Sequence, residues 1–460
     1  MSFSLTPEET FLWDVAQNWR TPEKITLPPL DWAQVAKTAV PNRMATLLKR
    51  VLTARAVWPT LPDAPRAEIE ASAQRLQDNA ALMSASLADY LQQAHARGLD
   101  TVVLKGLSIS NNIYGDPAMR PGGDIDILVR RDQIRPCIEI LHAMGIGPFW
   151  PNLMADAYYE RHHLHHQRCT PDLKIWFEPH WALDHPYTVL TIDYAAMLNR
   201  THPGELLGQP VRDLTLPDLL LSLAVHLVKH AIYLPHTFTR PDLARGILAD
   251  GMLMYYLDIA EVIKQNSGSE AQSASFDFAK PLEFGKRTPL RTLSSSINWD
   301  AVISLARETG TVDIFGAVLA VCRTLLDTPI PDRVLEALPV RAAGSVTRRA
   351  MNAVLDREIA QYLGVPSSKF WDVMLVTNGA FILRPIRLLE TAPYFFASSD
   401  FLRRKYGRAG FLTGAGHFAR AVGQFARFGW DAVYFAVERY RRLKGIGYST
   451  SLFNRLETGG

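Results

Sequence analysis

Asp124 and Asp126, separated by a single residue, are the side chains in this 460-residue chain whose spacing most clearly predicts chemistry. They alternate with Ile125 and Ile127 in a segment that favours a β-strand. Because strand side chains alternate between faces, both carboxylates would share one face and both isoleucines the other. Mg²⁺ requires oxygen ligands and is commonly held by one or two carboxylates plus substrate phosphates. The pair therefore predicts a divalent-metal site, and the alternative for such a pair is a solvated strand edge.

A lysine–glycine pair lies upstream of the aspartates. Lys105 and Gly106 follow the short apolar run Val102–Leu104, which favours a buried strand. The residues from Leu107 to Asn111 can begin a helix, and the backbone N–H groups at the start of a helix suit phosphate groups. A strand, a glycine turn and a helix beside two carboxylates predict a site for a metal ion that carries a triphosphate.

The stretch from Leu104 to Val129 resembles the uncharacterised bacterial nucleotidyltransferase family, part of the DNA polymerase β-like nucleotidyltransferase superfamily. The family core has the pattern L-K-G, then Y, then R-P-x-x-D-I-D-L-L-V, and the matching residues are Leu104-Lys105-Gly106, Tyr114, Arg120-Pro121 and Asp124–Val129. The superfamily's usual Gly-Ser pair is absent because Leu107 follows Gly106, and Ser108 is the candidate replacement for the serine. The resemblance implies an α+β fold: a small mixed, polymerase β-like sheet flanked by helices and followed by mostly helical C-terminal regions.

The resemblance also implies a third active-site carboxylate. The family has a histidine pair, a short turn and a strand that ends Glu-x-His-Trp, which matches Glu178-Pro179-His180-Trp181 in a strand expected over 172–181. Glu178 is then expected on a strand beside the one that holds Asp124 and Asp126. These three carboxylates form the expected catalytic and metal-binding group.

Two helices expected over 215–233 and 251–264 match a helix pair of the family. The first has His226, Lys229 and His230 on one face, because residues three and four apart are neighbours on a helix. In related enzymes these helices cover the nucleotide and supply a cation for its phosphates. The alternative is a surface role for Lys229 and a capping role for Asp258. The expected nucleotide-binding residues are Lys105, Gly106, Ser108, Arg120, Lys229 and Asp258.

Four histidines lie within five residues, at positions 162, 163, 165 and 166. They suggest a metal, but adjacent histidines on a strand face opposite sides, and no cysteine or carboxylate at zinc-like spacing completes a ligand set. Packing and surface hydrogen bonding are therefore the first expectation. Binding of the acceptor or of phosphate is the alternative, and we expect His180 to position other groups rather than to act as a base. The candidates for this role are His165, His166 and His180.

The elements that must position these residues follow from helix periodicity and turn residues. An alanine-rich segment over 66–98 predicts a long helix that ends near Gly98, just before the first strand. Asp132 is expected to cap a helix that ends near Met144, and the polar segment 265–295 is expected to form a lid. The expected regions are an N-terminal helical region (1–70), the nucleotidyltransferase catalytic core (71–210), a helical nucleotide- and acceptor-binding domain (211–345) and a basic helical C-terminal region (346–460).

Composition and charge limit the location and the partners. Three well-separated cysteines favour a reducing compartment. The N-terminus lacks the pattern of a signal peptide, and no apolar run reaches the ~20 residues of a transmembrane helix. A cytoplasmic protein is therefore expected. From Arg348 to Gly460 there are 17 Lys and Arg against 8 Asp and Glu. We expect this basic region to pack on its own domain, with peripheral contact to an anionic membrane or partner as the alternative. Nucleic acid is not an expected partner, since no binding motif is present.

The combined expectation is a Mg²⁺-dependent nucleotidyltransferase, with Mn²⁺ as the alternative ion. It would move a nucleoside monophosphate, AMP from ATP by preference, to a hydroxyl, phosphate or carboxylate of a small molecule, sugar or peptide. The resemblance suggests natural-product or surface-polysaccharide biosynthesis. The alternatives are a toxin-like or regulatory enzyme that modifies protein or tRNA, and a non-catalytic nucleotide-binding protein. The sequence predicts neither the acceptor nor the oligomeric state.

Overall fold

The computed structural model describes residues 5–120, 122–149, 156–184, 190–231, 243–249, 251–267, 297–339 and 399–420, together with residues 422, 423 and 426. Most of the expected lid (265–295) and most of the basic C-terminal region (346–460) lie outside these described residues.

Three short helices open the described chain: α1 (Pro7–Asn18), α2 (Trp32–Ala39) and α3 (Ala45–Ala54). A capping box starts α1, in which the Thr6 hydroxyl accepts from the Glu9 N–H and the Glu9 carboxylate accepts from the Thr6 N–H. Their buried faces join one hydrophobic cluster with helices from the second half of the described chain. The N-terminal helices are therefore packed into the later helical layer.

The longest helix, α4 (Asp63–Ala96), confirms the expected long helix and spans 34 residues. Gly98 follows it with φ +69°, a left-handed conformation that favours glycine after a helix. The first half of α4, with Ile69, packs in the helical cluster, whereas the second half, with Tyr90, packs in a second cluster beneath the sheet. Residue 71, where the catalytic core was expected to begin, lies inside this helix.

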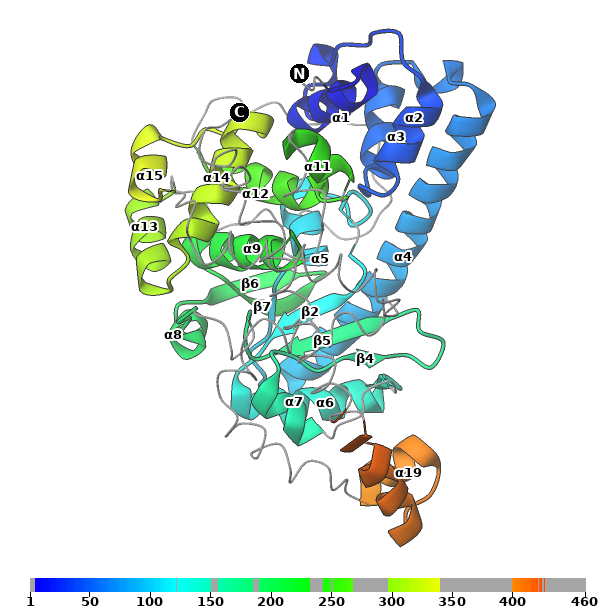
Figure 1. Cartoon of the computed structure of the whole chain (residues 1–460), viewed down its shortest axis with the longest axis vertical. Coiled ribbons are helices and arrows are strands. Elements are labelled where there is room, and N and C mark those ends of the chain that lie inside the picture. The colour runs from blue at the N-terminus through cyan, green and yellow to red at the C-terminus, as the bar shows by residue number, and fades with distance from the viewer. Residues whose placement is uncertain are drawn as a thin grey trace, which may run out of the picture.

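A five-stranded sheet lies beside the second half of α4 (Figure 1), and it confirms the expected small mixed sheet. Strands β2 and β5 are parallel neighbours, and the other pairings are antiparallel. In sheet order the strands are β1 (Val102–Val103), β2 (Ile125–Leu128), β5 (Trp176–His180), β4 (Arg168–Cys169) and β3 (Gly147–Pro148).

One face of the sheet packs on α4 and α6 (Ile134–Ala143) through Ile125, Ile127 and Phe177. The rings of Phe177 and Tyr90 are 5.6 Å apart between centroids and are fully buried, an aromatic contact that anchors β5 to α4. Because side chains alternate along a strand, the residues beside these apolar anchors must point to the opposite face.

Two sequence expectations about these elements are wrong in detail. Asp132 does not cap α6: it lies in a 3₁₀ turn over Arg131–Gln133, and α6 begins directly after Gln133. The strand expected over 172–181 begins only at Trp176, because Asp172 forms a turn with Thr170 and the N–H of Lys174. The side-chain hydrogen bonds of a short polar residue compete here with strand extension.

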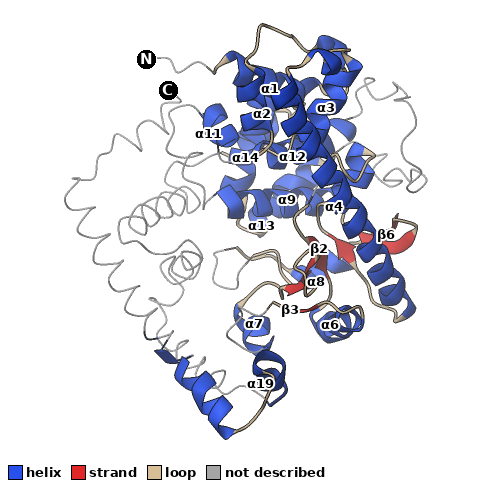
Figure 2. Cartoon of the chain, turned by 90° about the vertical axis from the view of Figure 1, so that its right-hand side faces the viewer, coloured by secondary structure: helices blue, strands red, loops and turns tan. Residues whose placement is uncertain are grey.

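The opposite face of the sheet lies toward the helical layer, as Figures 1 and 2 show. Helix α9 (Leu216–Ala231) shares a pocket with residues of β2 and β5 and with the segment after β1. The antiparallel pair β6 (His202–Leu206) and β7 (Gln209–Asp213) lies beside β1. Within the described residues, no helix is long and apolar enough to cross a membrane. Further α-helices among the described residues are α7 (Asp156–His162), α8 (Tyr194–Asn199), α11 (Leu243–Ala249), α12 (Leu253–Gln265), α13 (Trp299–Glu308), α14 (Val312–Leu326), α15 (Asp332–Ala337) and α19 (Ser399–Tyr406).

Candidate functional site

The parallel pairing of β2 and β5 brings two of the three predicted carboxylates together. Asp126 lies directly opposite Glu178 in the register of the two strands. Paired residues of neighbouring strands point to the same face, and here that face is opposite to the one with Ile125 and Phe177. Asp124 immediately precedes β2, and one carboxylate oxygen from each of the three residues lies within 4.8 Å of the others.

The three carboxylates differ in their exposure to solvent. The side chain of Asp126 is 3% exposed, that of Glu178 is 14% exposed and that of Asp124 is 33% exposed. The group is therefore buried at one end and open to solvent at the other. An ion can reach it from solvent, and its oxygen donors match the preference of Mg²⁺.

Lys105 lies against both aspartates. Its Nζ is 2.9 Å from Asp124 Oδ1 and also contacts Asp126 Oδ2, and the lysine side chain is only 10% exposed. Burial lowers the pKa of Lys105, but the charges of Asp124 and Asp126 outweigh it and raise the pKa above its ordinary value. The ammonium group is therefore charged, and it offsets part of the repulsion among the three carboxylates.

Gly106 and Ser108 begin the turn after Lys105. Gly106 has φ +62° and ψ −111°, a conformation that is essentially restricted to glycine, and it precedes the short helix α5 (Leu107–Ile109). The chain continues as a π-helical turn over Ser110–Tyr114. The side chain of Ser108 is half-buried on the first turn of α5. Gly106 lies close to the segment before β2, since a Cβ at this position would be 3.8 Å from the carbonyl oxygen of Asp124.

The structure pairs Arg120 with Asp258 in the core. Arg120 Nε is 2.6 Å from Asp258 Oδ2, and the two side chains are 5% and 1% exposed. The Tyr114 hydroxyl donates to Asp258 Oδ1 over 3.1 Å. Because the two charges are satisfied by each other in the core, we assign Arg120 and Asp258 to holding α12 against the loop before β2 rather than to phosphate binding.

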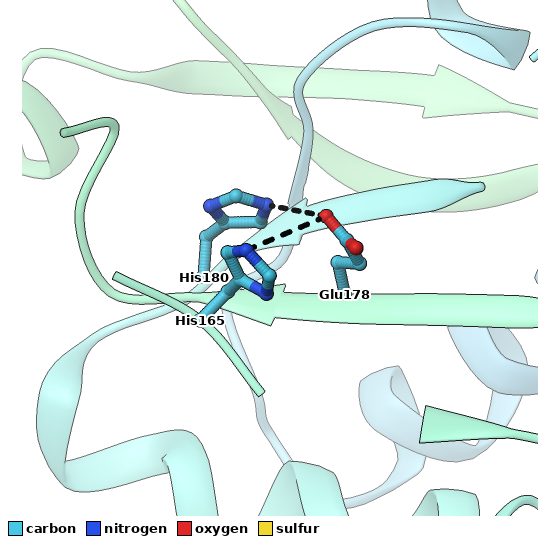
Figure 3. A group of neighbouring side chains, drawn as sticks. All are labelled: His165, Glu178 and His180. Carbon is cyan, nitrogen blue, oxygen red and sulfur yellow. Dashed lines mark ion pairs between the residues drawn. The ribbon is translucent and has the colours of Figure 1, made fainter. Parts of the chain in front are cut away.

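The three candidate histidines lie in two different places. His180 Nε2 is 3.0 Å from Asp126 Oδ1, and His180 Nδ1 is 3.1 Å from the carbonyl oxygen of Ala182. Burial lowers the pKa of His180, but its contacts with Asp126 and Glu178 outweigh this and raise the pKa. His165 lies beside Glu178 and His180, as Figure 3 shows.

His166 faces a different part of the molecule from His165. Its ring nitrogens lie 3.7 Å from Glu160 and 3.9 Å from Asp156, and its ring lies 5.1 Å from that of Trp181. Burial lowers the pKa of His166 below its ordinary value. The structure thus separates the two neighbouring histidines that the sequence treated alike, and only His165 lies with the carboxylates.

A pocket separates the carboxylate face of the sheet from α9. Lys105 lies at the sheet side of this pocket and Lys229 on α9 at the other. Burial lowers the pKa of Lys229, although the charges of Glu178 and Asp126 act in the opposite direction. The residues that line the pocket are Leu104, Lys105, Asp126, His180, Leu183, Ser222, Leu223, His226 and Lys229.

His226 is a pocket residue that the site prediction left out. It lies one helical turn from Lys229 on the same face of α9, and its ring is 4.5 Å from that of His230. Burial and the nearby lysines hold the pKa of His226 well below its ordinary value and lower the pKa of His230, chiefly by burial, to about 4. Both rings are therefore neutral at pH 7. The spacing of His226, Lys229 and His230 in the sequence was the available signal.

The fold and the pocket can be compared with known families at this point. A mixed sheet with three convergent carboxylates, one of which lines a pocket together with two lysines, is an arrangement that suits an enzyme that handles phosphates through a divalent ion. A family model described as uncharacterised nucleotidyltransferase matches residues 28–286, more than half of the chain. The chain belongs to this family and is a transferase that moves nucleotidyl groups. Searches of curated proteins and of solved structures gave no match.

The family match extends well beyond the stretch from Leu104 to Val129 that carries the main resemblance. It begins in the loop before α2, so it includes N-terminal helices that precede the glycine turn and the aspartates. It ends within the segment after α12 that the structure does not describe. The carboxylates, the pocket and α9 all lie inside the matched region.

Proposed function

We propose that this protein transfers a nucleoside monophosphate from a triphosphate, ATP by preference, to a hydroxyl, phosphate or carboxylate of a small molecule, sugar or peptide. In this proposal Asp124, Asp126 and Glu178 hold Mg²⁺. The observation that supports it most is the register of β2 and β5, which sets Asp126 opposite Glu178 beside a lysine-lined pocket. The proposal keeps residues 71–210 as the part of the chain that supplies these catalytic groups.

Transfer forms a bond between the acceptor oxygen and the α-phosphorus and breaks the bond from that phosphorus to the oxygen that bridges to the β-phosphate, so pyrophosphate leaves. Negative charge develops on phosphoryl oxygens, and fixed positive groups are the main source of rate enhancement. Bound Mg²⁺ supplies such charge against the phosphoryl oxygens.

The chain's own residues have separate tasks in this proposal. Lys105 and Lys229 approach the phosphates from opposite sides of the pocket and hold them by charge-assisted hydrogen bonds. His180 holds the Asp126 carboxylate in place through the 3.0 Å contact between Nε2 and Oδ1. Glu178 either completes the ligand set or takes the proton of the acceptor, and the Mg²⁺ affinity of Glu178→Gln separates these two roles.

The test is transfer of label from α-labelled ATP, CTP, GTP and UTP in cell extract, with and without Mg²⁺. We expect label to depend on Mg²⁺ and to fall by about 100- to 1,000-fold in Asp126→Asn, because one ligand charge is lost. Asp172→Asn is the matched control, since Asp172 is 53% exposed on the turn before β5. Wild-type-like transfer by Asp126→Asn contradicts the assignment, whereas a labelled macromolecule points to a protein or tRNA acceptor.

A further inference from the structure

A second group of metal-binding side chains adjoins the three carboxylates. His165 and His180 contribute imidazole nitrogens, and Glu178 contributes a carboxylate oxygen. One ligand atom from each lies within 4.8 Å of the others, and both histidines are buried. Figure 3 shows the two rings converging on the Glu178 carboxylate.

Backbone pairing fixes this convergence. Glu178 and His180 are two residues apart on β5 and so share a face of the strand. His165 forms an antiparallel bridge with His180, and a residue directly opposite another on a neighbouring segment lies on the same face. The N–H of His166 bonds to the carbonyl of Pro179, and the N–H of Trp181 bonds to the carbonyl of Leu164. These backbone bonds hold the segment around His165 in a defined register with β5.

The two contacts with Glu178 suit a shared ion better than direct hydrogen bonds. Glu178 Oε2 lies 3.7 Å from His165 Nε2 and 3.7 Å from His180 Nε2, which is too long for a hydrogen bond. Two ligands of a tetrahedral ion with bonds of about 2.0–2.1 Å are separated by about 3.4 Å. Each contact thus needs to shorten by only a few tenths of an ångström to hold an ion.

The surroundings of His180 also suit a metal ligand. Its Nδ1 lies 3.1 Å from the carbonyl oxygen of Ala182 and can only donate to it, so in the neutral ring Nε2 is the nitrogen with the lone pair. Metal-bound histidines typically donate their other N–H to a carbonyl or carboxylate in this way. In this arrangement a bound ion takes the place of the proton that His180 Nε2 otherwise shares with Asp126 Oδ1, 3.0 Å away.

We infer that His165, His180 and Glu178 form a binding site for one Zn²⁺-class ion, distinct in donor chemistry from the all-carboxylate group. Imidazole nitrogen suits Zn²⁺, whereas Mg²⁺ prefers oxygen ligands. Three protein ligands leave the fourth position of a tetrahedral ion open to water or to an oxygen of the acceptor. This site goes beyond the proposed transfer reaction. It shares Glu178 with the group assigned to Mg²⁺ and adjoins Asp126, whose Oδ1 lies 3.0 Å from His180 Nε2.

The test is calorimetric titration of the untagged full-length chain with Zn²⁺ in excess Mg²⁺, without nucleotide. We expect one equivalent of Zn²⁺, and an affinity at least about 100-fold weaker in His165→Ala, because one of three ligands is lost. His166→Ala is the matched control and is expected to bind as the wild type does, since His166 faces Glu160 and Asp156. Co²⁺ in place of Zn²⁺ should give visible absorption bands that the same variant loses.

Several outcomes overturn the inference. Absence of Zn²⁺ binding by the wild type does so. Equal binding by His165→Ala and the wild type, or equal loss in His166→Ala, places the ion elsewhere. Asp124→Asn separates this inference from the proposed function, because it should lose Mg²⁺-dependent transfer but retain Zn²⁺. Circular dichroism checks the folding of each variant, and His165→Gln serves if the alanine variant is unfolded.

Discussion

Replacing Asp258 by alanine tests whether the Arg120–Asp258 pair is structural. The 2.6 Å contact joins side chains that are 5% and 1% exposed, so the substitution leaves a buried guanidinium without its carboxylate. Removal of one partner from such a pair costs about 3–5 kcal/mol. The Tyr114 hydroxyl loses its acceptor as well, and Tyr114→Phe alone should cost about 1–2 kcal/mol.

Urea unfolding followed by far-ultraviolet circular dichroism measures these costs. The double variant Arg120→Met with Asp258→Leu should lose less stability than Asp258→Ala, because apolar residues of similar size do not leave a buried charge unpaired. Binding of ATP by whatever variant remains folded should be close to that of the wild type. If Asp258→Ala is as stable as the wild type but binds ATP more weakly, the pair contacts the nucleotide and our reassignment is wrong.

Three further predictions concern the pocket and its turn. The pKa of His230 is lowered from 6.5 to about 4, so the unfolded chain binds more protons than the folded chain between these pH values. The free energy of unfolding should therefore fall as pH falls from 6.5 to 4. His230→Gln should reduce that slope in urea titrations. Gly106→Ala should cost about 1–3 kcal/mol in the same assay because of its φ of +62°, whereas Gly123→Ala, with no atom near its added methyl group, should cost little. Lys229→Met should raise the KM for ATP by about 10- to 100-fold, while Lys174→Met, 69% exposed, should not; an unchanged KM removes Lys229 from the phosphate site.

The elements that depend on local residue chemistry could be predicted from the sequence. The helical spacing along α4, the glycine that ends it and the alternation at Asp124–Val129 each specify local conformation directly. The pattern around Glu178 placed it beside the aspartates only through the family resemblance, because strand pairing between distant segments leaves no local signal. The structure supplies the register that sets Glu178 opposite Asp126.

The partners of the charged side chains could not be predicted in the same way. Arg120 and Asp258 are charged residues in family motifs, and a sequence does not show whether two charges that are distant along the chain neutralise each other in the core. His165 and His166 illustrate the same limit. Their opposite orientations follow from the bridge between His165 and His180, which forms only once the loop has packed beside β5.

The continuity of α4 has a practical consequence for isolating the catalytic core. Its early turns, with Ile69 and Ala73, are inserted among the N-terminal helices, and its late turns, with Leu87 and Tyr90, support the strands. A fragment starting at residue 71 would cut α4 and expose apolar surface both on the fragment and on the N-terminal helices. A shortened chain that is to stay folded must keep all of α4 together with the helices that pack against its N-terminal half.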